Sequence, residues 1–276
     1  MRQAVCSILV LFLAVFPAAA QFSDCSSGLL QMPTADMPED ATFSITNNWL
    51  NKNALPNGWG YDTFQYGFGI SFWKRFELGM AFTIFDGRKT SRTETYWRIM
   101  RNQDRHLFCR LLVLREGEFG LDWMPALLVG VSDPVTGVGG DYLNGNVNAT
   151  GNGYFNRSYV VASKHFSSPW GTIGAHAGYQ YSVRVDYVIN GPCAGVNWRP
   201  VWVQDRGILD HLDVIAEYDS RTLNLGCIAT VWDGRFQAMF EIQNLKWVNF
   251  GLRYQLRLKE ININSAPKWA SNLLAL

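Results

Sequence analysis

Apolar and polar residues alternate along most of the chain after residue 40. Between 248 and 258, every even position carries a large apolar side chain, and the odd positions carry Asn, Gly, Arg or Gln. The same two-residue period runs through 64–72, 172–181, 211–218 and 235–242. Side chains on a β-strand point alternately to its two faces, so this period predicts strands with one apolar and one polar face.

Twelve segments of this kind are expected as strands, with no helix of convincing length among them. No internal repeat or linker divides the chain, so it is expected to form one domain. The expected strands are 41–50, 61–74, 75–85, 105–114, 121–132, 154–166, 170–181, 194–204, 209–219, 221–232, 234–242 and 246–258.

Three features favour a transmembrane barrel over a secreted soluble sandwich, which is the alternative with the same period. The strands run about 10 residues, enough to cross a bilayer at a tilt, whereas soluble strands average about 5–6. Aromatic residues gather at strand ends, as they do at membrane interfaces. The polar face is rich in Gly, Gln, Asn, His and Arg, which suits a wet lumen. The predicted fold class is therefore all-β, a single antiparallel barrel of about 12 strands with both termini in the periplasm.

Composition excludes several other classes of protein. Charged residues make up only 17% of the 276 residues, against about 25% in an average globular protein, and hydrophobic residues make up 48%. Disordered chains need more charge and fewer aromatics. The formal net charge of +1 argues against nucleic acid as a partner. No apolar run of about 18 residues follows the N-terminus, which argues against a helical membrane protein.

The N-terminus indicates export. Residues 1–20 have one positive charge, a short apolar core and small residues before Ala20, the pattern of a cleaved signal peptide. The expected organisation is a signal peptide at 1–20, a periplasmic N-terminal segment at 21–40, the barrel at 41–258 and a tail at 259–276. The expected location is the bacterial outer membrane.

Four cysteines remain after the predicted cleavage: Cys25, Cys109, Cys193 and Cys227. An exported chain can form disulfides, so one disulfide and buried free thiols are both open. No Cys or His spacing matches a known metal site. We therefore expect no metal and no cofactor.

One pair of residues suggests an enzyme. His165 and Ser167 have the H-x-S spacing of outer-membrane phospholipase A, itself a twelve-stranded barrel, and residues i and i+2 of a strand share a face. However, the residues that follow, Ser168 to Trp170, do not continue that enzyme's motif. A lipid or glycan hydrolase is therefore an alternative, and no enzymatic activity is the expectation.

Several longer stretches form an ordered set of motifs. They are Gly28–Ala35, Gln103–Arg105, Leu111–Gly117, Met124–Pro134, Asn156–Lys164 and Glu217–Ser220. This order resembles the YjbH family of exopolysaccharide-associated outer-membrane proteins, and the resemblance covers roughly 28–258. Many members look like paired barrel units, whereas this chain has one.

The resemblance implies a role in the production or export of surface polysaccharide and carries over no catalytic residue. The implied partners are outer-membrane lipid, polysaccharide and other export-machinery proteins. A structural or adhesive barrel is a further alternative.

The candidate site is a network of charged and polar residues on the lumen face. Arg253 and Arg257 share the polar parity of the last strand, and an arginine facing lipid at the midplane would cost about 2–4 kcal/mol. Two buried cations need acidic partners. The candidate network is Arg253, Arg257, Glu241, Glu217, Asp219, Asp213, His211 and His176; the family motifs add Arg105, Glu116 and Lys164 at strand ends or on the lumen side. The network either holds the barrel together or contacts the hydroxyls and carboxylates of a sugar chain.

Overall fold

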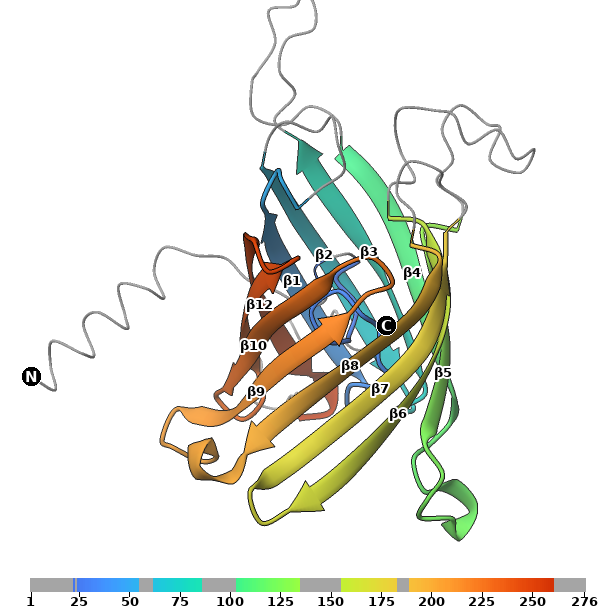
Figure 1. The fold of residues 1–276 in the computed structure, drawn as a ribbon, viewed down its shortest axis with the longest axis vertical. Helices are drawn as coiled ribbons and strands as arrows, with labels where there is room; N and C mark the ends of the chain where they lie inside the picture. The colour runs from blue at the N-terminus through green and yellow to red at the C-terminus, as the bar shows by residue number, and fades with distance from the viewer. Residues whose placement is uncertain are drawn as a thin grey trace, which may run out of the picture.

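The computed structural model describes residues 22, 24–54, 62–85, 103–134, 155–182 and 189–260. They form twelve antiparallel strands in a closed barrel (Figure 1). Each strand pairs with its neighbours in the sequence, and β1 pairs with β12 to close the ring. The predicted fold class, a closed barrel of twelve antiparallel strands, is confirmed.

The twelve strands correspond one to one to the expected segments. They are β1 (Thr42–Leu50), β2 (Thr63–Phe72), β3 (Phe76–Phe85), β4 (Gln103–Leu114), β5 (Ala126–Ser132), β6 (Arg157–Ser168), β7 (Gly171–Tyr181), β8 (Gly191–Pro200), β9 (Leu209–Tyr218), β10 (Leu223–Val231), β11 (Phe236–Gln243) and β12 (Trp247–Arg257).

Two boundaries differ from the prediction where proline intervenes. The fifth strand begins at Ala126 rather than at 121, directly after Pro125, and the short 3-10 helix η1 (Glu118–Gly120) occupies part of the connection. The eighth strand ends at Pro200 rather than at 204, where the 3-10 helix η3 (Val201–Val203) begins. Proline lacks an amide hydrogen and cannot donate to a strand ladder, so pairing stops beside it.

One end of the barrel carries five short connections. Antiparallel order places the links β2–β3, β4–β5, β6–β7, β8–β9 and β10–β11 at this end, with the start of β1 and the end of β12. In the β2–β3 turn, Trp73 and Lys74 both have positive φ, 56° and 53°. Two such residues in succession match the right-handed twist of the strands they join. We call this end the short-turn end; it is the lower end in Figure 1.

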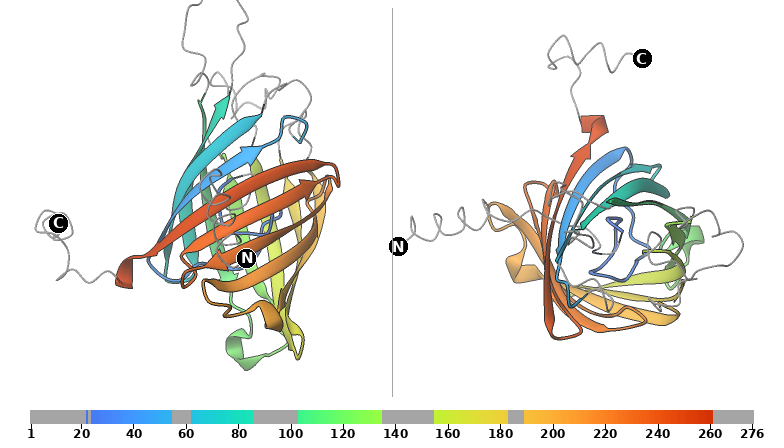
Figure 2. Two further views of the ribbon diagram at one scale, coloured as in Figure 1. Left: turned by 90° about the vertical axis from the view of Figure 1, so that its left-hand side faces the viewer. Right: turned by 90° about the horizontal axis from the view of Figure 1, so that it is seen from above.

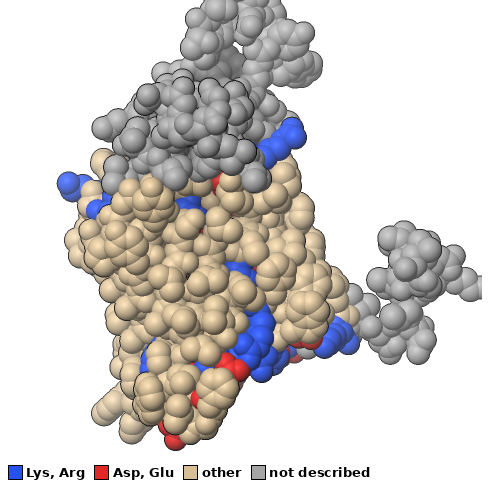
Figure 3. All heavy atoms as spheres, turned by 90° about the vertical axis from the view of Figure 1, so that its right-hand side faces the viewer, with Lys and Arg blue, Asp and Glu red and all other residues tan. Residues whose placement is uncertain are grey.

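The two faces of the strands differ as the alternation predicts. Outward side chains are mostly apolar, and Ile45, Phe68 and Val160 are each more than two-fifths exposed. Figure 3 shows one side of this surface, largely uncharged, with most of the charged groups toward the lower end. Inward side chains are mostly polar and buried, as are Thr46 and Asn48 of β1.

The described part of the N-terminal segment, which the sequence separates from the barrel strands, lies inside the barrel. Viewed along the barrel, the segment (blue) lies within the ring of strands (Figure 2, right). Its apolar residues pack on inward side chains in two buried groups. Phe22, Leu29 and Leu30 share one group with Ile215, Ile228 and Met239, among others; Met32 and Ala35 share the other with Leu112, Leu128 and Val161, among others. We call Asp24–Met37 the plug segment.

Some expectations fall on residues outside the described ranges. These are the signal peptide at 1–20, the tail beyond 260 and most of the long connections. In the described part of the chain, no helix is long and apolar enough to cross a membrane.

Candidate functional site

Carboxylates on one side of the lumen hold the middle of the plug segment. Glu217 of β9 accepts hydrogen bonds from the backbone amides of Leu30, Gln31 and Met32, at 3.0, 2.6 and 3.2 Å. Glu241 of β11 accepts from Gln31 Nε2 at 2.9 Å. Amide bonds to a carboxylate are roughly twice as strong as neutral ones. Glu217 therefore fixes three consecutive residues of the segment.

Arginines elsewhere around the lumen hold the two flanks of the plug segment. Arg157 of β6 donates to Asp24 Oδ2 at 2.7 Å and to the Gln31 carbonyl at 2.8 Å. Arg253 of β12 donates to Ser27 Oγ at 3.0 Å and to the Cys25 carbonyl at 3.3 Å. Both arginines are almost fully buried.

A third arginine fixes the point where the segment leaves the lumen. Arg110 of β4 donates to the carbonyls of Thr34 and Asp36, at 2.6 and 3.1 Å, and forms an ion pair with Glu77 of β3. Glu77 also lies 3.9 Å from Arg253 and accepts from Ser27 Oγ at 3.1 Å. One buried carboxylate is thus shared by two arginines and the plug segment.

The lumen sets the protonation of two residues in the segment. Burial alone would raise the pKa of Asp24, but the charge of Arg157 and its hydrogen bond lower that pKa overall, so Asp24 is ionised. Burial raises the pKa of the Cys25 thiol well above its usual value, so it stays protonated. All four cysteines of the described chain are free thiols, which decides between the two possibilities left open by the sequence.

Three residues of the predicted network reach the plug segment: Glu217, Glu241 and Arg253. The sequence predicted acidic partners for the buried arginines of β12 but no particular pairs, and the structure supplies the pairs. Glu241 accepts from Gln31 and Asn249, whereas the carboxylate nearest to Arg253 belongs to Glu77. The closed ring brings β3 and β12 close across β1 and β2, a proximity that parity alone does not show.

Three other predicted residues belong to the barrel wall. Asp213 of β9 accepts two hydrogen bonds from Arg199 of β8, at 3.1 and 2.8 Å, and lies 3.6 Å from His211. Asn197 of β8 links Asp213 to His176 of β7 through bonds of 2.9 and 3.0 Å. This network ties three successive strands together.

The remaining predicted residues lie at the rims. Asp219 caps the turn after β9, where it accepts from the amides of Arg221 and Thr222 at 3.0 and 2.6 Å. Arg257 donates to the Asp233 carbonyl at 3.0 Å. Arg105 lies exposed near the start of β4, on its outward parity, so of the two predicted places it has the strand end and not the lumen side.

Four charged residues of the site are absent from the predicted network: Asp24, Glu77, Arg110 and Arg157. The alternating pattern could have identified Glu77 and Arg110 as lumen residues, because each shares its parity with the other inward residues of its strand. No signal existed for Asp24, which lies in a segment without any period.

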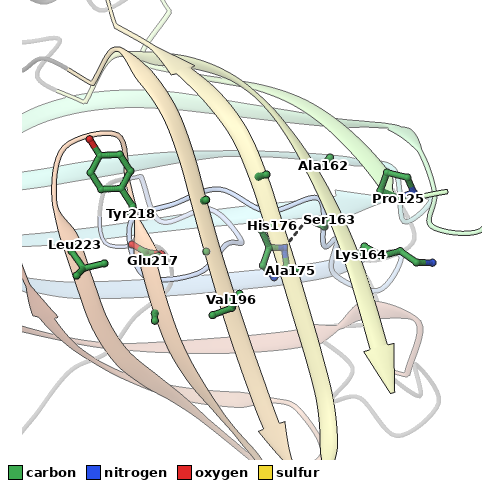
Figure 4. Close-up of a pocket in the computed structure, with 14 residues that line it drawn as sticks. Pro125, Ala162, Ser163, Lys164, Ala175, His176, Val196, Glu217, Tyr218 and Leu223 are labelled. Atoms are coloured by element: carbon green, nitrogen blue, oxygen red, sulfur yellow. Dashed lines mark hydrogen bonds between the residues drawn. The ribbon is translucent and has the colours of Figure 1, made fainter. Parts of the chain in front are cut away.

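A Ser–His–Asn chain of hydrogen bonds also lies in the wall. Ser163 Oγ lies 2.8 Å from His176 Nδ1 (Figure 4, dashed), and His176 Nε2 lies 3.0 Å from Asn197 Oδ1. These residue types occur in hydrolases, but Ser163 is fully buried and accepts a hydrogen bond from the Ala35 amide at 2.7 Å. The hydroxyl is thus engaged by the plug segment and by His176, so the chain of bonds anchors the plug segment to the wall.

The pair His165 and Ser167 is not arranged as a catalytic pair either. His165 Nδ1 lies 2.8 Å from Glu116 Oε2, whereas Ser167 is exposed near the end of β6. Among the described residues, those that come close enough to hold a metal ion are Asp36, His165 and His176.

Small side chains line a hollow in the barrel wall at strands β6 to β9. The hollow of ≈ 470 Å³ is lined mainly by residues of β6 to β9, among them the polar inward residues His176 and Glu217 (Figure 4). Its lining includes Ala162, Ala175, Ala177, Ala194, Val196 and Ala216.

Residues 24–266 match the model of a family described as "Exopolysaccharide biosynthesis protein YbjH". The chain belongs to this YjbH family. No curated protein matches the chain. The matched region contains the plug segment and all twelve strands, so the YjbH domain of this chain is the closed barrel together with the segment inside it.

Proposed function

We propose that this YjbH-family chain is an outer-membrane barrel that assists exopolysaccharide secretion or assembly without catalysing a reaction, and that its lumen is closed at rest by its own plug segment. The short-turn end faces the periplasm. The partners are outer-membrane lipid, the polysaccharide and other export-machinery proteins.

One observation carries the membrane assignment: each of the five connections at the short-turn end presents one exposed tryptophan. Their exposed fractions run from 49% to 72%, and the residues are Trp73, Trp123, Trp170, Trp202 and Trp232. Indole rings favour the bilayer–water boundary, where an apolar ring and a polar N–H are both accommodated. Tryptophans at every connection of one end, next to an apolar outer face, match the aromatic girdle of a membrane barrel and support the proposed location.

The filled lumen supports an assisting role rather than a permanently open pore. Three arginines and three glutamates hold the plug segment across the interior, and apolar side chains pack around it. A polysaccharide could cross only after those contacts open. The buried Ser163 and the separated His165 and Ser167 give no support to hydrolysis.

The test is deletion of the gene followed by complementation. We expect surface polysaccharide to fall on deletion and to return with the wild-type gene, and the protein to fractionate with the outer membrane as a heat-modifiable species. Unchanged polysaccharide, or a soluble periplasmic protein, would contradict the proposal.

Two serine variants and a control test the hydrolase alternative. Ser167→Ala and Ser163→Ala each remove one candidate nucleophile, and Ser168→Ala is the control on the same strand. We expect all three to support polysaccharide output at equal protein level. Loss of output with Ser167→Ala alone, accompanied by loss of lipase activity, would favour the hydrolase.

A further inference from the structure

Two imidazoles and one carboxylate meet where the plug segment leaves the lumen. His165 comes from β6, His176 from β7 and Asp36 from the segment itself, and one donor atom of each lies within 4.8 Å of the others. His165 Nε2 lies 3.5 Å from Asp36 Oδ1, and the two rings lie 5.8 Å apart, nearly perpendicular. Donor atoms around one zinc ion lie about 3.3 Å apart, so contraction by roughly 1–1.5 Å closes the set.

The surroundings of His165 orient it as a metal ligand. Its Nδ1 lies 2.8 Å from Glu116 Oε2, and its backbone amide donates to Glu116 Oε1 at 3.0 Å. Metal-binding histidines usually donate their second ring nitrogen to a carboxylate in this way, which fixes the tautomer and the ring. The lone pair of Nε2 is then directed toward the side of Asp36.

Asp36 is held by its backbone while its carboxylate stays adjustable. Arg110 fixes the carbonyls of Thr34 and Asp36, and Ser163 fixes the amide of Ala35. The Asp36 side chain remains 48% exposed. It can therefore move toward an ion without disturbing the plug segment.

A glycine leaves space between the two rings. Gly174 of β7 pairs with His165, and a Cβ atom at Gly174 would lie 2.9 Å from His176 Nε2 and 3.1 Å from His165 Cδ2. It would also lie 2.1 Å from Asn197 Oδ1. An ion bound to His176 would replace one of the two hydrogen bonds that its ring makes, to Ser163 or to Asn197.

We propose that Asp36, His165 and His176 bind a divalent transition-metal ion of the Zn²⁺ class, which fastens the plug segment to the barrel wall. Two imidazoles with one carboxylate select borderline ions such as Zn²⁺, Co²⁺ and Ni²⁺ over Mg²⁺ and Ca²⁺, which prefer all-oxygen sites. Three protein ligands leave at least one coordination position for water. Glu116 is a positioning residue that acts through His165.

The test is metal titration of the folded, purified barrel in detergent, without a polyhistidine tag and after chelator treatment. We expect one equivalent of Zn²⁺ to bind and Co²⁺ to give the visible absorption of a low-symmetry site with nitrogen ligands. Mg²⁺ and Ca²⁺ should not compete. Because binding is measured on the isolated protein, the result does not depend on the proposed role in polysaccharide export.

Variants locate the site. Asp36→Asn and His165→Ala should each weaken Zn²⁺ binding by at least about tenfold, and Glu116→Gln by about 10- to 100-fold, the usual range for a group that orients a ligand. His211→Ala removes a histidine of the neighbouring wall network and should leave affinity unchanged. Heat-modifiable mobility establishes that each variant is folded. Zn²⁺ binding that is equal in Asp36→Asn, His165→Ala and wild type, or no binding of Zn²⁺, Co²⁺ or Ni²⁺ to the wild type, would overturn the proposal.

Discussion

Glu217 on β9 and Arg110 on β4 both hold the plug segment by its backbone, but they hold opposite groups. Glu217 accepts from three amides of the segment, and Arg110 donates to two of its carbonyls. An irregular segment has no strand ladder to satisfy its backbone, and an unpaired buried amide or carbonyl is costly. The lumen supplies a charged acceptor at Glu217 and a charged donor at Arg110.

The two sides also differ in how their charges are balanced. Arg110 and Arg157 each form an ion pair with a buried carboxylate, Glu77 and Asp24 respectively. Glu217 forms no ion pair with any residue of the described chain and relies on amides and on Asn224. Removing Arg157 therefore leaves the Asp24 carboxylate buried without its ion-pair partner, whereas replacing Glu217 removes only an acceptor.

The largest effect is expected from Arg157→Met. It leaves Asp24 charged and buried without its partner, and breaking a buried pair in this way costs about 3–5 kcal/mol. The free energy of unfolding in detergent, from denaturant titration, measures it. Asp24→Asn added to Arg157→Met should recover much of the loss. If the double variant is no more stable than Arg157→Met alone, the unpaired charge of Asp24 is not the cause of the lost stability.

Next comes the difference between the two faces of β12, tested by Leu252→Arg. Leu252 lies on the outward parity and Arg253 on the inward one. Under the proposed function the outward face contacts lipid, where a cation near the midplane costs about 2–4 kcal/mol. We expect Leu252→Arg to reduce assembly into membranes, measured by heat-modifiable mobility. Its matched counterpart is Arg253→Leu. If Leu252→Arg assembles normally while Arg253→Leu does not, the inside and outside faces of β12 are assigned wrongly.

A smaller effect is expected from Glu217→Gln. The amide side chain keeps one oxygen acceptor but loses its charge, so the bonds to the backbone of the segment weaken, at a cost of about 1–2 kcal/mol. Protease sensitivity of residues 24–37 should rise while the barrel stays folded, and Gln243→Ala on β11 serves as a control away from the segment's amides. If Glu217→Gln lowers the free energy of unfolding as much as Arg157→Met does, the contrast between an unpaired acceptor and a buried ion pair is contradicted.

Much of the barrel could be predicted from the sequence. Successive side chains of a strand point to opposite faces, so an apolar outside and a polar inside give a sequence that alternates with a period of two. The faces of β12 and the twelve segments followed from that period alone. The lumen position of Glu217, Glu241 and Arg253 followed from parity as well. Their partners did not, because register and closure decide which inward residues meet.

What the sequence determined by itself is the wall: its strand count, its inside and outside, and the family to which it belongs. What only the tertiary structure decided is the interior. Gly28–Ala35 has no period, and its backbone is satisfied by side chains far along the chain; the amide of Leu30 and its acceptor Glu217 are 187 residues apart. Local pattern cannot report contacts at that separation, because they exist only once the ring has closed around the segment.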